Sequence, residues 1–179
     1  MNASHNSPFR GLGGGGIFII GFMGSGKSYW GRIWATAHGL DFYDLDGMIE
    51  VNENRSVTEI FKEKGENYFR ERENAMLKCF HEKDNFLLAC GGGTPCFYDN
   101  MQWMNDTGIT VYLSAFPEYL SEKLSAEIHT RPLLMDCKPG ELNLFIEKKL
   151  REREFFYKQA NFILPVTECN EHSLAFLNP

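Results

Sequence analysis

The sequence lacks a long apolar run. No stretch approaches the roughly 18–20 apolar residues that a helix needs to cross a membrane. Residues 1–16 contain no apolar stretch of signal-peptide length, and their polar residues and four consecutive glycines at 13–16 predict a flexible leader, natural or added for expression. We therefore expect no membrane partner and a cytoplasmic location.

Cysteine is sparse and shows no pattern. The five cysteines are an odd number, and no two have CxxC spacing: Cys79, Cys90, Cys96, Cys137 and Cys169. A disulfide framework and a structural zinc site both need paired or clustered cysteines. Reduced thiols in a cytosolic protein are the better interpretation.

Positive charge is in the minority, with 18 Lys and Arg against 24 Asp and Glu and a net charge of −6. A general nucleic-acid binder would usually be basic, so we expect no nucleic-acid partner. Phosphate ligands remain compatible, because a few well-placed cations decide their binding locally. The 179 residues, 43% of them hydrophobic, suffice for one domain over 17–179, expected to be a monomer.

Short apolar runs alternate with helical patterns along the chain. The predicted strands are 17–20, 40–43, 86–90, 109–113 and 162–166. The predicted helices are 27–38, 56 to about 81 with a break near Gly65, 98–105, 116–127 and 141–159. This alternation indicates an α/β fold with a parallel sheet covered on both faces. Ligands bind such sheets at the carboxyl ends of the strands.

The segment Gly21–Ser28 matches the P-loop pattern G-x-x-x-x-G-K-[ST] between a predicted strand and a predicted helix. In a P-loop the backbone N–H groups cradle phosphates and the helix N-terminus favours the negative charge. Lys27 would reach the β- and γ-phosphates, and the Ser28 hydroxyl would ligate Mg²⁺. A glycine-rich turn with a solvated lysine is the alternative. The residues expected to contact ATP are Gly24, Ser25, Gly26, Lys27, Ser28 and Tyr29.

Two carboxylates, Asp44 and Asp46, follow the second predicted strand. In a strand, this spacing aims both side chains the same way, whereas they diverge if the second begins a helix. Beside a P-loop, one acid could support Mg²⁺ through water and the other could accept a hydrogen bond from an acceptor hydroxyl. The alternative is that Asp46 caps the N-terminus of a following helix.

Arg70 and Glu73 lie at i and i+3 and share one helix face. The glutamate could hold the guanidinium in place for a carboxylate ligand, although a solvated charged face is the commoner reading of this pattern. Three consecutive glycines, Gly91–Gly93, follow a predicted buried strand. They suit a ligand that lies against bare backbone, and a long flexible turn is the alternative.

Two further arginines are candidates. Arg131 precedes Pro132, and an arginine on a mobile segment could close over ATP and neutralise charge in the transition state. Arg153 lies in the last predicted helix, and for both residues a surface position is the alternative. The neighbouring Phe155, Phe156 and Tyr157 are interpreted as core residues.

In order and spacing, these motifs resemble the shikimate kinase family of nucleoside-monophosphate-kinase-like P-loop kinases. The resemblance runs from about 17 to 166 and is carried by GFMGSGKS (21–28), FYDLD (42–46), IFKEKGENYFRERE (60–73), the glycine triplet (91–93), RPLL (131–134) and the R-x-x-x-Y-x-x-A pattern of Arg153, Tyr157 and Ala160. It implies a three-layer α/β/α fold with a five-stranded parallel sheet in the order 2-3-1-4-5. It also implies a substrate-binding region at about 44–73 and a mobile lid at about 122–137.

The resemblance implies transfer of the ATP γ-phosphate to the 3-hydroxyl of shikimate. Ser28 would ligate Mg²⁺, with Asp44 in its outer shell. Lys27 and Arg131 would act on the phosphates as catalytic residues, Arg131 from the lid.

On the acceptor side, the resemblance makes Asp46 the catalytic residue that binds the shikimate hydroxyls and orients or deprotonates the attacking one. Arg70 and Arg153 would clamp the shikimate carboxylate, with Glu73 positioning Arg70. The glycines Gly91, Gly92 and Gly93 would contact the substrate.

Three features depart from the family pattern. Lys123 is the nearest cation where the family carries a second lid arginine. No arginine follows Arg153 to contact adenine, and the tail after the fifth strand is short for the family's terminal helix. Two alternatives stay open: a related kinase for gluconate or a nucleoside monophosphate, and a nucleotide-binding module without turnover. The D-x-D, FR-x-x-E and GGG set favours shikimate.

Overall fold

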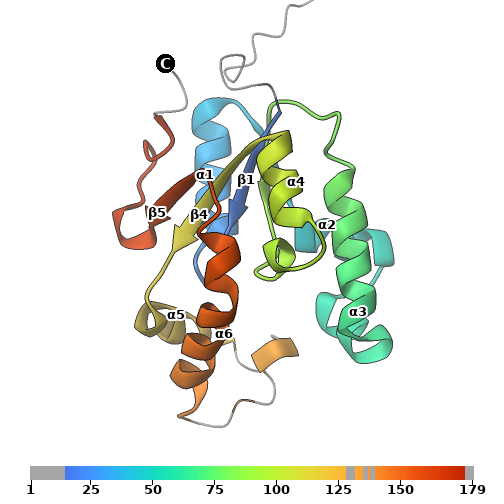
Figure 1. Cartoon of the computed structure of the whole chain (residues 1–179), viewed down its shortest axis with the longest axis vertical. Helices are drawn as coiled ribbons and strands as arrows, with labels where there is room; N and C mark the ends of the chain where they lie inside the picture. The colour runs from blue at the N-terminus through green and yellow to red at the C-terminus, as the bar shows by residue number, and fades with distance from the viewer. Residues whose placement is uncertain (1–14, 128–131, 135–136, 138–139, 176–179) are drawn as a thin grey trace, which may run out of the picture.

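The computed structural model describes residues 15–127, 132–134, 137 and 140–175, in which five parallel strands lie between two layers of helices (Figure 1). The strands are β1 (Ile17–Ile20), β2 (Asp41–Asp44), β3 (Phe86–Ala89), β4 (Ile109–Ser114) and β5 (Phe162–Pro165). Their order is β2-β3-β1-β4-β5, and each neighbouring pair is parallel. The predicted sheet and its strand order are therefore confirmed.

The helices are α1 (Lys27–His38), α2 (Leu45–Glu53), α3 (Val57–Lys78), α4 (Asn100–Thr107), α5 (Pro117–Leu124) and α6 (Leu142–Tyr157), with short 3₁₀ turns η1 (Thr94–Cys96), η2 (Pro132–Leu134) and η3 (Val166–Glu168). Strand β1 shows how the core divides. Ile17 and Ile19 pack in a cluster with Trp34 of α1, while Phe18 and Ile20 pack in a cluster with residues of α2, α3 and α4. Alternate side chains of a strand point to opposite faces, so the sheet is buried on both.

Local signals set several boundaries as predicted. Helix α1 begins after Gly26 and ends at Gly39, whose φ of 65° is typical of a glycine C-cap. Helix α3 begins at a capping box: the Ser56 hydroxyl accepts from the Glu59 N–H at 3.2 Å, and the Ser56 N–H donates to Glu59 Oε2 at 2.7 Å. Gly65, with φ 81° and ψ 170°, kinks α3 at the predicted break.

Helix α2 is not among the predicted helices, and the sequence offered a helix here only as the alternative in which Asp46 is its N-cap. The chain passes from β2 into this helix without a loop, and Asp44 is the N-cap, accepting from the Gly47 N–H at 3.2 Å. The alternative that made Asp46 the cap is therefore wrong. Asp46 lies in the first turn of α2, so its side chain and that of Asp44 diverge.

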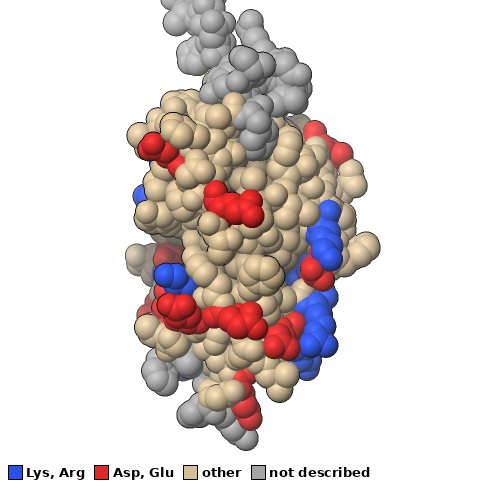
Figure 2. Space-filling view, turned by 90° about the vertical axis from the view of Figure 1, so that its left-hand side faces the viewer, with Lys and Arg blue, Asp and Glu red and all other residues tan. Residues whose placement is uncertain are grey.

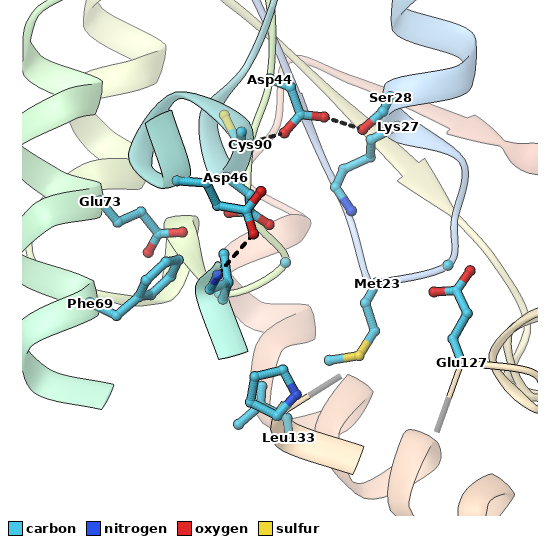
Figure 3. Close-up of a pocket in the computed structure, with 18 of the residues that line it drawn as sticks. Met23, Lys27, Ser28, Asp44, Asp46, Phe69, Glu73, Cys90, Glu127 and Leu133 are labelled. Carbon is cyan, nitrogen blue, oxygen red and sulfur yellow. Dashed lines mark hydrogen bonds between the residues drawn. The ribbon is translucent and has the colours of Figure 1, made fainter. Parts of the chain in front are cut away.

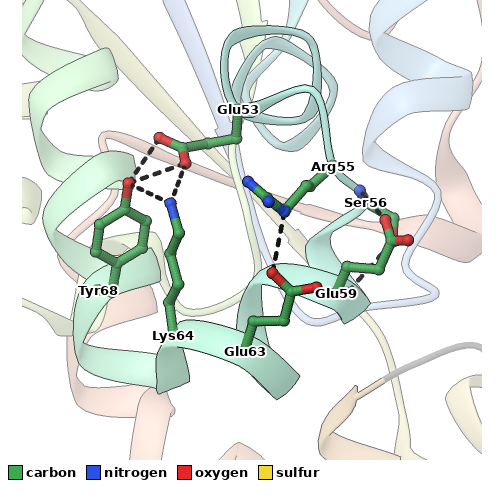
Figure 4. Close-up of polar contacts among 7 residues, drawn as sticks. All are labelled: Glu53, Arg55, Ser56, Glu59, Glu63, Lys64 and Tyr68. Carbon is green, nitrogen blue, oxygen red and sulfur yellow. Dashed lines mark hydrogen bonds and ion pairs between the residues drawn. The ribbon is translucent and has the colours of Figure 1, made fainter.

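Polar contacts fasten the end of α2 and the turn after it to α3 on both sides of the Gly65 kink (Figure 4). Glu53 at the end of α2 accepts hydrogen bonds from Lys64 Nζ at 2.9 Å and from the Tyr68 hydroxyl. Arg55 pairs with Glu63, Nε to Oε2, at 3.0 Å. These contacts hold the predicted substrate-binding region together as one unit.

Two further expectations, the core position of residues 155–157 and the short tail after β5, can be compared with the structure. Tyr157 is fully buried, but Phe155 is 74% exposed, so its assignment to the core is wrong. The short tail after β5 packs on α1: Leu174 is buried, and Trp34 Nε1 donates to the Asn170 carbonyl at 2.8 Å.

Charge is distributed in keeping with the acidic composition. On the side where β5 lies in Figure 1, acidic side chains form a band with some basic ones among them, and the described residues make no broad basic patch on this face (Figure 2). None of the described helices is both long and apolar enough to span a membrane.

Candidate active site

A cavity of about 750 Å³ gathers most of the predicted site residues at the carboxyl ends of β1, β2 and β3 (Figure 3). Its lining includes Gly24, Gly26, Lys27, Ser28, Tyr29, Asp44, Asp46, Arg70, Glu73, Gly91, Gly92, Gly93 and Arg153. Ser25 is fully buried and does not line it. Arg131 lies outside the residues that the structure describes.

The P-loop forms one wall of the cavity. Gly24 and Gly26 have φ of 78° and 86°, in the left-handed region that favours glycine. Gly26 offers no side-chain cap to α1, so this helix end presents backbone N–H groups suited to an anion. Lys27 Nζ donates to the Phe22 carbonyl at 2.8 Å, and Figure 3 shows the lysine reaching along the cavity wall.

Ser28 and Asp44 bring oxygen atoms together beside the P-loop. The Ser28 hydroxyl donates to Asp44 Oδ2 at 2.5 Å (Figure 3). Hard oxygen donors of this kind suit Mg²⁺, which takes one or two protein oxygens and completes its shell with water and phosphate. Within the described ranges, no group of three or more His, Cys, Asp or Glu could hold a metal by itself. The pair therefore fits Mg²⁺ that arrives with a nucleotide.

Gly91 separates two carboxylates of the acceptor side. A Cβ atom at this position would lie 2.4 Å from Glu73 Oε1 and 2.8 Å from Asp46 Oδ1. Any side chain here would displace both acids. The first glycine of the triplet is thus required by close approach, and the flexible-turn alternative does not explain it.

Arg70 is held rigidly, with 4% of its surface exposed. Its Nη1 donates to Glu73 Oε2 and its Nη2 donates to Glu66 Oε1, both at 2.9 Å, and its Cζ lies 4.5 Å from the Phe97 ring centroid. Burial alone would lower the pKa of Arg70, but Glu73 and Glu66 raise it above its usual range. Arg70 is a fixed buried cation and does not lie on a solvated face.

Glu73 in turn is held by a residue that the sequence did not single out. It is fully buried, and its Oε1 accepts from the Thr94 hydroxyl at 2.5 Å. Both carboxylate oxygens therefore have donors. A Cβ at Gly93 would lie 2.6 Å from Arg70 Nη2, so the third glycine also makes room for this network.

Arg153 reaches the cavity from α6 and is 8% exposed. Its Cζ lies 5.4 Å from the Phe22 ring centroid, and its Nη1 would lie 3.4 Å from a Cβ at Gly92. This buried Nη1 has no hydrogen-bond partner in the described part of the chain. A buried guanidinium with an unused donor fits an anionic ligand.

Several lining residues gave no recognisable sequence signal. Thr58 and Phe61 enter from the first part of α3, and Glu127 comes from the residues after α5. Only proximity in the fold reveals them, because none belongs to a motif with a chemical meaning of its own. Lys123 lines the cavity although its position departs from the family pattern.

The cavity thus has a triphosphate-binding wall facing a pocket with buried guanidinium groups, a carboxylate and bare backbone. Together with the sheet order, this arrangement defines the chain as a P-loop kinase with a small anionic acceptor.

The comparisons with known proteins give the family. The sequence model of the shikimate kinase family matches residues 23–175. A shikimate kinase from Parabacteroides distasonis is 40% identical over 163 residues, which cover 89% of this chain and 94% of that protein. The chain belongs to the shikimate kinase family, whose activity is the phosphorylation of shikimate by ATP.

Solved structures agree with this membership. The crystal structure of shikimate kinase from Bacteroides thetaiotaomicron has a TM-score of 0.80 at 41% identity and covers 87% of this chain and 88% of that one. A shikimate kinase from Acinetobacter baumannii in complex with shikimate has a TM-score of 0.81 at 28% identity, with 90% and 89% coverage. The chain is therefore a transferase of the shikimate pathway.

Proposed function

We propose that this chain transfers the γ-phosphate of ATP to the 3-hydroxyl of shikimate, with Mg²⁺ held in part by Ser28 and Asp44. The observation that carries the proposal is the pair of buried guanidinium groups, Arg70 and Arg153, at the glycine triplet in the same cavity as the P-loop. Two arginines suit the planar carboxylate of shikimate.

On the donor side, the P-loop N–H groups and Lys27 bind the β- and γ-phosphates. The Ser28 hydroxyl and the Asp44 carboxylate would hold the metal, and their hydrogen bond shows that both oxygens reach one place. Bound Mg²⁺ would supply neutralisation of phosphate charge. Arg131, which lies outside the described residues, is proposed to add a second positive charge from a lid at about 122–137.

On the acceptor side, Arg70 and Arg153 bind the carboxylate, and Glu73 keeps Arg70 in place. Asp46 binds the ring hydroxyls and orients the attacking 3-hydroxyl. It accepts the proton of this hydroxyl as the new O–P bond forms and the bond from the γ-phosphorus to the leaving ADP oxygen breaks. The glycine triplet lets the ring lie against the backbone. Anchoring the ring at both ends converts a bimolecular attack into an oriented one.

We also propose that the enzyme acts as a cytoplasmic monomer, with residues 1–16 as a leader outside the kinase domain of 17–179. The described residues that line the cavity all come from one copy of the chain, which supports a monomer. Light scattering coupled to size exclusion tests it: a mass near 20.6 kDa is expected, and a mass of twice this value would overturn it.

The experiment that tests the function is ADP release with shikimate, gluconate and nucleoside monophosphates as acceptors, with Mg²⁺ present or chelated. We expect ADP release only with shikimate among these acceptors, and only when Mg²⁺ is present. Faster release with gluconate or a nucleotide would support the related-kinase alternative. ATP binding without release for any acceptor would support the non-catalytic module.

A further inference from the structure

The hydroxyl of Tyr157 makes a contact that none of the roles above uses. Tyr157 lies at the end of α6 and is fully buried. Its Oη donates to the backbone carbonyl of Gly92 at 2.5 Å. Gly92 is the central residue of the glycine triplet, so the last turn of α6 is tied directly to the loop against which the substrate is proposed to lie.

The Gly92 residue sits where the two halves of the site meet. A Cβ there would lie 3.2 Å from the Met23 amide nitrogen, 3.5 Å from the Gly21 carbonyl oxygen and 3.4 Å from Arg153 Nη1. The P-loop backbone and the Arg153 guanidinium therefore both lie close to Gly92. Any rotation of this peptide would change the spacing between donor and acceptor.

Arg153 and Tyr157 are four residues apart on α6 and therefore share one face of the helix. One helical turn thus supplies both a cation for the substrate and the hydrogen bond that holds the loop beside it. The Tyr157 ring is packed at 4.9 Å, centroid to centroid, from the ring of Tyr112 on β4. This packing limits the ring to one orientation, which keeps the hydroxyl aimed at Gly92.

We expect burial to keep the Tyr157 hydroxyl protonated near neutral pH. Burial raises the pKa of Tyr157 well above its usual value, and the nearby positive charge of Arg153 only partly opposes this. Tyr157 is accordingly a constant donor. Without it, the Gly92 carbonyl would lose a hydrogen bond in a half-buried position, which frees the loop to move.

We propose that Tyr157 is a positioning residue of the acceptor site, whose hydroxyl fixes the Gly92 peptide and thereby the spacing between the P-loop and Arg153. The inference rests on the proposed function, because it concerns how that site holds shikimate. Tyr157 is not proposed to contact the reacting atoms.

The test compares Tyr157→Phe with Tyr112→Phe. Both variants delete one hydroxyl from the same aromatic pair, but only the Tyr157 hydroxyl bonds the glycine triplet. We expect Tyr157→Phe to raise the KM for shikimate at least about fivefold, the size of one net hydrogen bond, and to lower kcat, with the KM for ATP unchanged. Tyr112→Phe should retain wild-type constants. Equal constants for Tyr157→Phe and wild type would overturn the inference.

A double-mutant cycle with Arg153→Lys separates positioning from general destabilisation. If Tyr157 acts by placing the loop beside Arg153, the two losses in kcat/KM for shikimate will be strongly less than additive. Additive losses, or equal rises in both KM values with a lowered thermal midpoint, would mean a structural role only. If the wild-type enzyme is inactive with shikimate, the proposed function is wrong. If the wild type is active and Tyr157→Phe has the same constants, only the inference about Tyr157 is wrong.

A measurement on the unaltered enzyme covers the case in which Tyr157→Phe does not fold. With ring-labelled tyrosine, proton NMR should show a slowly exchanging Tyr157 hydroxyl proton that shifts when shikimate is added and does not shift with gluconate. A rapidly exchanging proton, or one insensitive to shikimate, would count against the inference.

Discussion

Arg70 shows how much a single residue of this site depends on its surroundings. Its guanidinium is buried, paired with Glu73 and Glu66, and lies against aromatic rings. The side chain is therefore held in one orientation, and its proposed contact with the shikimate carboxylate would cost little further entropy. The i, i+3 spacing in the sequence suggested the Glu73 contact, but burial of the pair follows only from packing.

Replacing Arg70 by lysine keeps the charge beside Glu73 and removes the planar fork. We expect Arg70→Lys to raise the KM for shikimate by at least about tenfold, because a charge-assisted bidentate pair is lost. The KM for ATP should not change. Arg72→Lys, two residues along α3 and exposed, is the matched control. An unchanged affinity for shikimate in Arg70→Lys would contradict the carboxylate clamp.

The proposed function makes Asp46 the residue on which the chemical step depends. Asp46→Asn removes the acceptor of the hydroxyl proton while keeping the shape, so turnover should fall at least about a hundredfold. The ATP dissociation constant should stay within twofold of wild type, since Ser28 and Asp44 make the contact beside the P-loop. Asp41→Asn, at the exposed start of β2, should behave as wild type. Lost ATP affinity in Asp46→Asn would contradict the assignment.

The thiols near the glycine triplet give a prediction about pH. Burial raises the pKa of Cys96 to about 11, although Arg153 and Arg70 oppose the shift, and burial raises the pKa of Cys90 well above its usual value. The reactive thiolate is therefore scarce near neutral pH. In a Cys79→Ser background, alkylation of the half-buried Cys96 should be slow at pH 7 and still accelerate above pH 9.

Bound shikimate should slow the alkylation of Cys96, and the alkylated enzyme should lose activity. Peptide mass spectrometry over a pH series would follow the modification. A rate that levels off below pH 9 would contradict the effect of burial, and full activity after modification would contradict the place of Cys96 beside the clamp.

At the scale of elements, α3 carries the substrate region as two segments joined at Gly65. Its φ and ψ of 81° and 170° lie in a region that only glycine adopts easily, and no atom lies within 4 Å of a Cβ placed there. The first segment bears Thr58 and Phe61 of the cavity, and the second bears Arg70 and Glu73. The kink therefore sets how the two parts of the pocket meet.

Gly65→Ala tests this kink without introducing a clash. Strain alone should lower the free energy of unfolding by about 1–3 kcal/mol and raise the KM for shikimate. Gly39→Ala is the matched control: its φ is 65°, it also has open space, and it lies away from the cavity. Its cost should be about 1–2 kcal/mol with no change in KM. Denaturant titration measures the stabilities, and wild-type stability for Gly65→Ala would refute the strained kink.

Elements with strong local signals could be predicted from the sequence, and those without could not. Gly26 and Gly39 mark the two ends of α1, and the capping box of Ser56 and Glu59 marks the start of α3. These signals can be recognised in the sequence because each acts within a few residues. Helix α2 was missed because β2 runs into it without a turn. The contacts of Thr94 with Glu73 and of Tyr157 with Gly92 join distant segments, and no local pattern encodes them.

At the scale of the whole molecule, the sheet brings segments from nearly the entire chain to one cavity. The P-loop follows β1, the two acids follow or end β2, the glycine triplet follows β3, and Arg153 comes from α6. The motif order suggested this meeting place, because parallel strands end at one edge. The roles proposed for these residues rest on this arrangement.

The central claim is that one cavity joins a triphosphate cradle to a clamp for a carboxylate. ADP release with shikimate and with its methyl ester, which lacks the anionic carboxylate, tests this most directly. We predict turnover with shikimate and at least about a hundredfold lower kcat/KM with the ester, because buried guanidinium groups would be left unpaired. Equal rates with the two acceptors, or no release with shikimate, would contradict it.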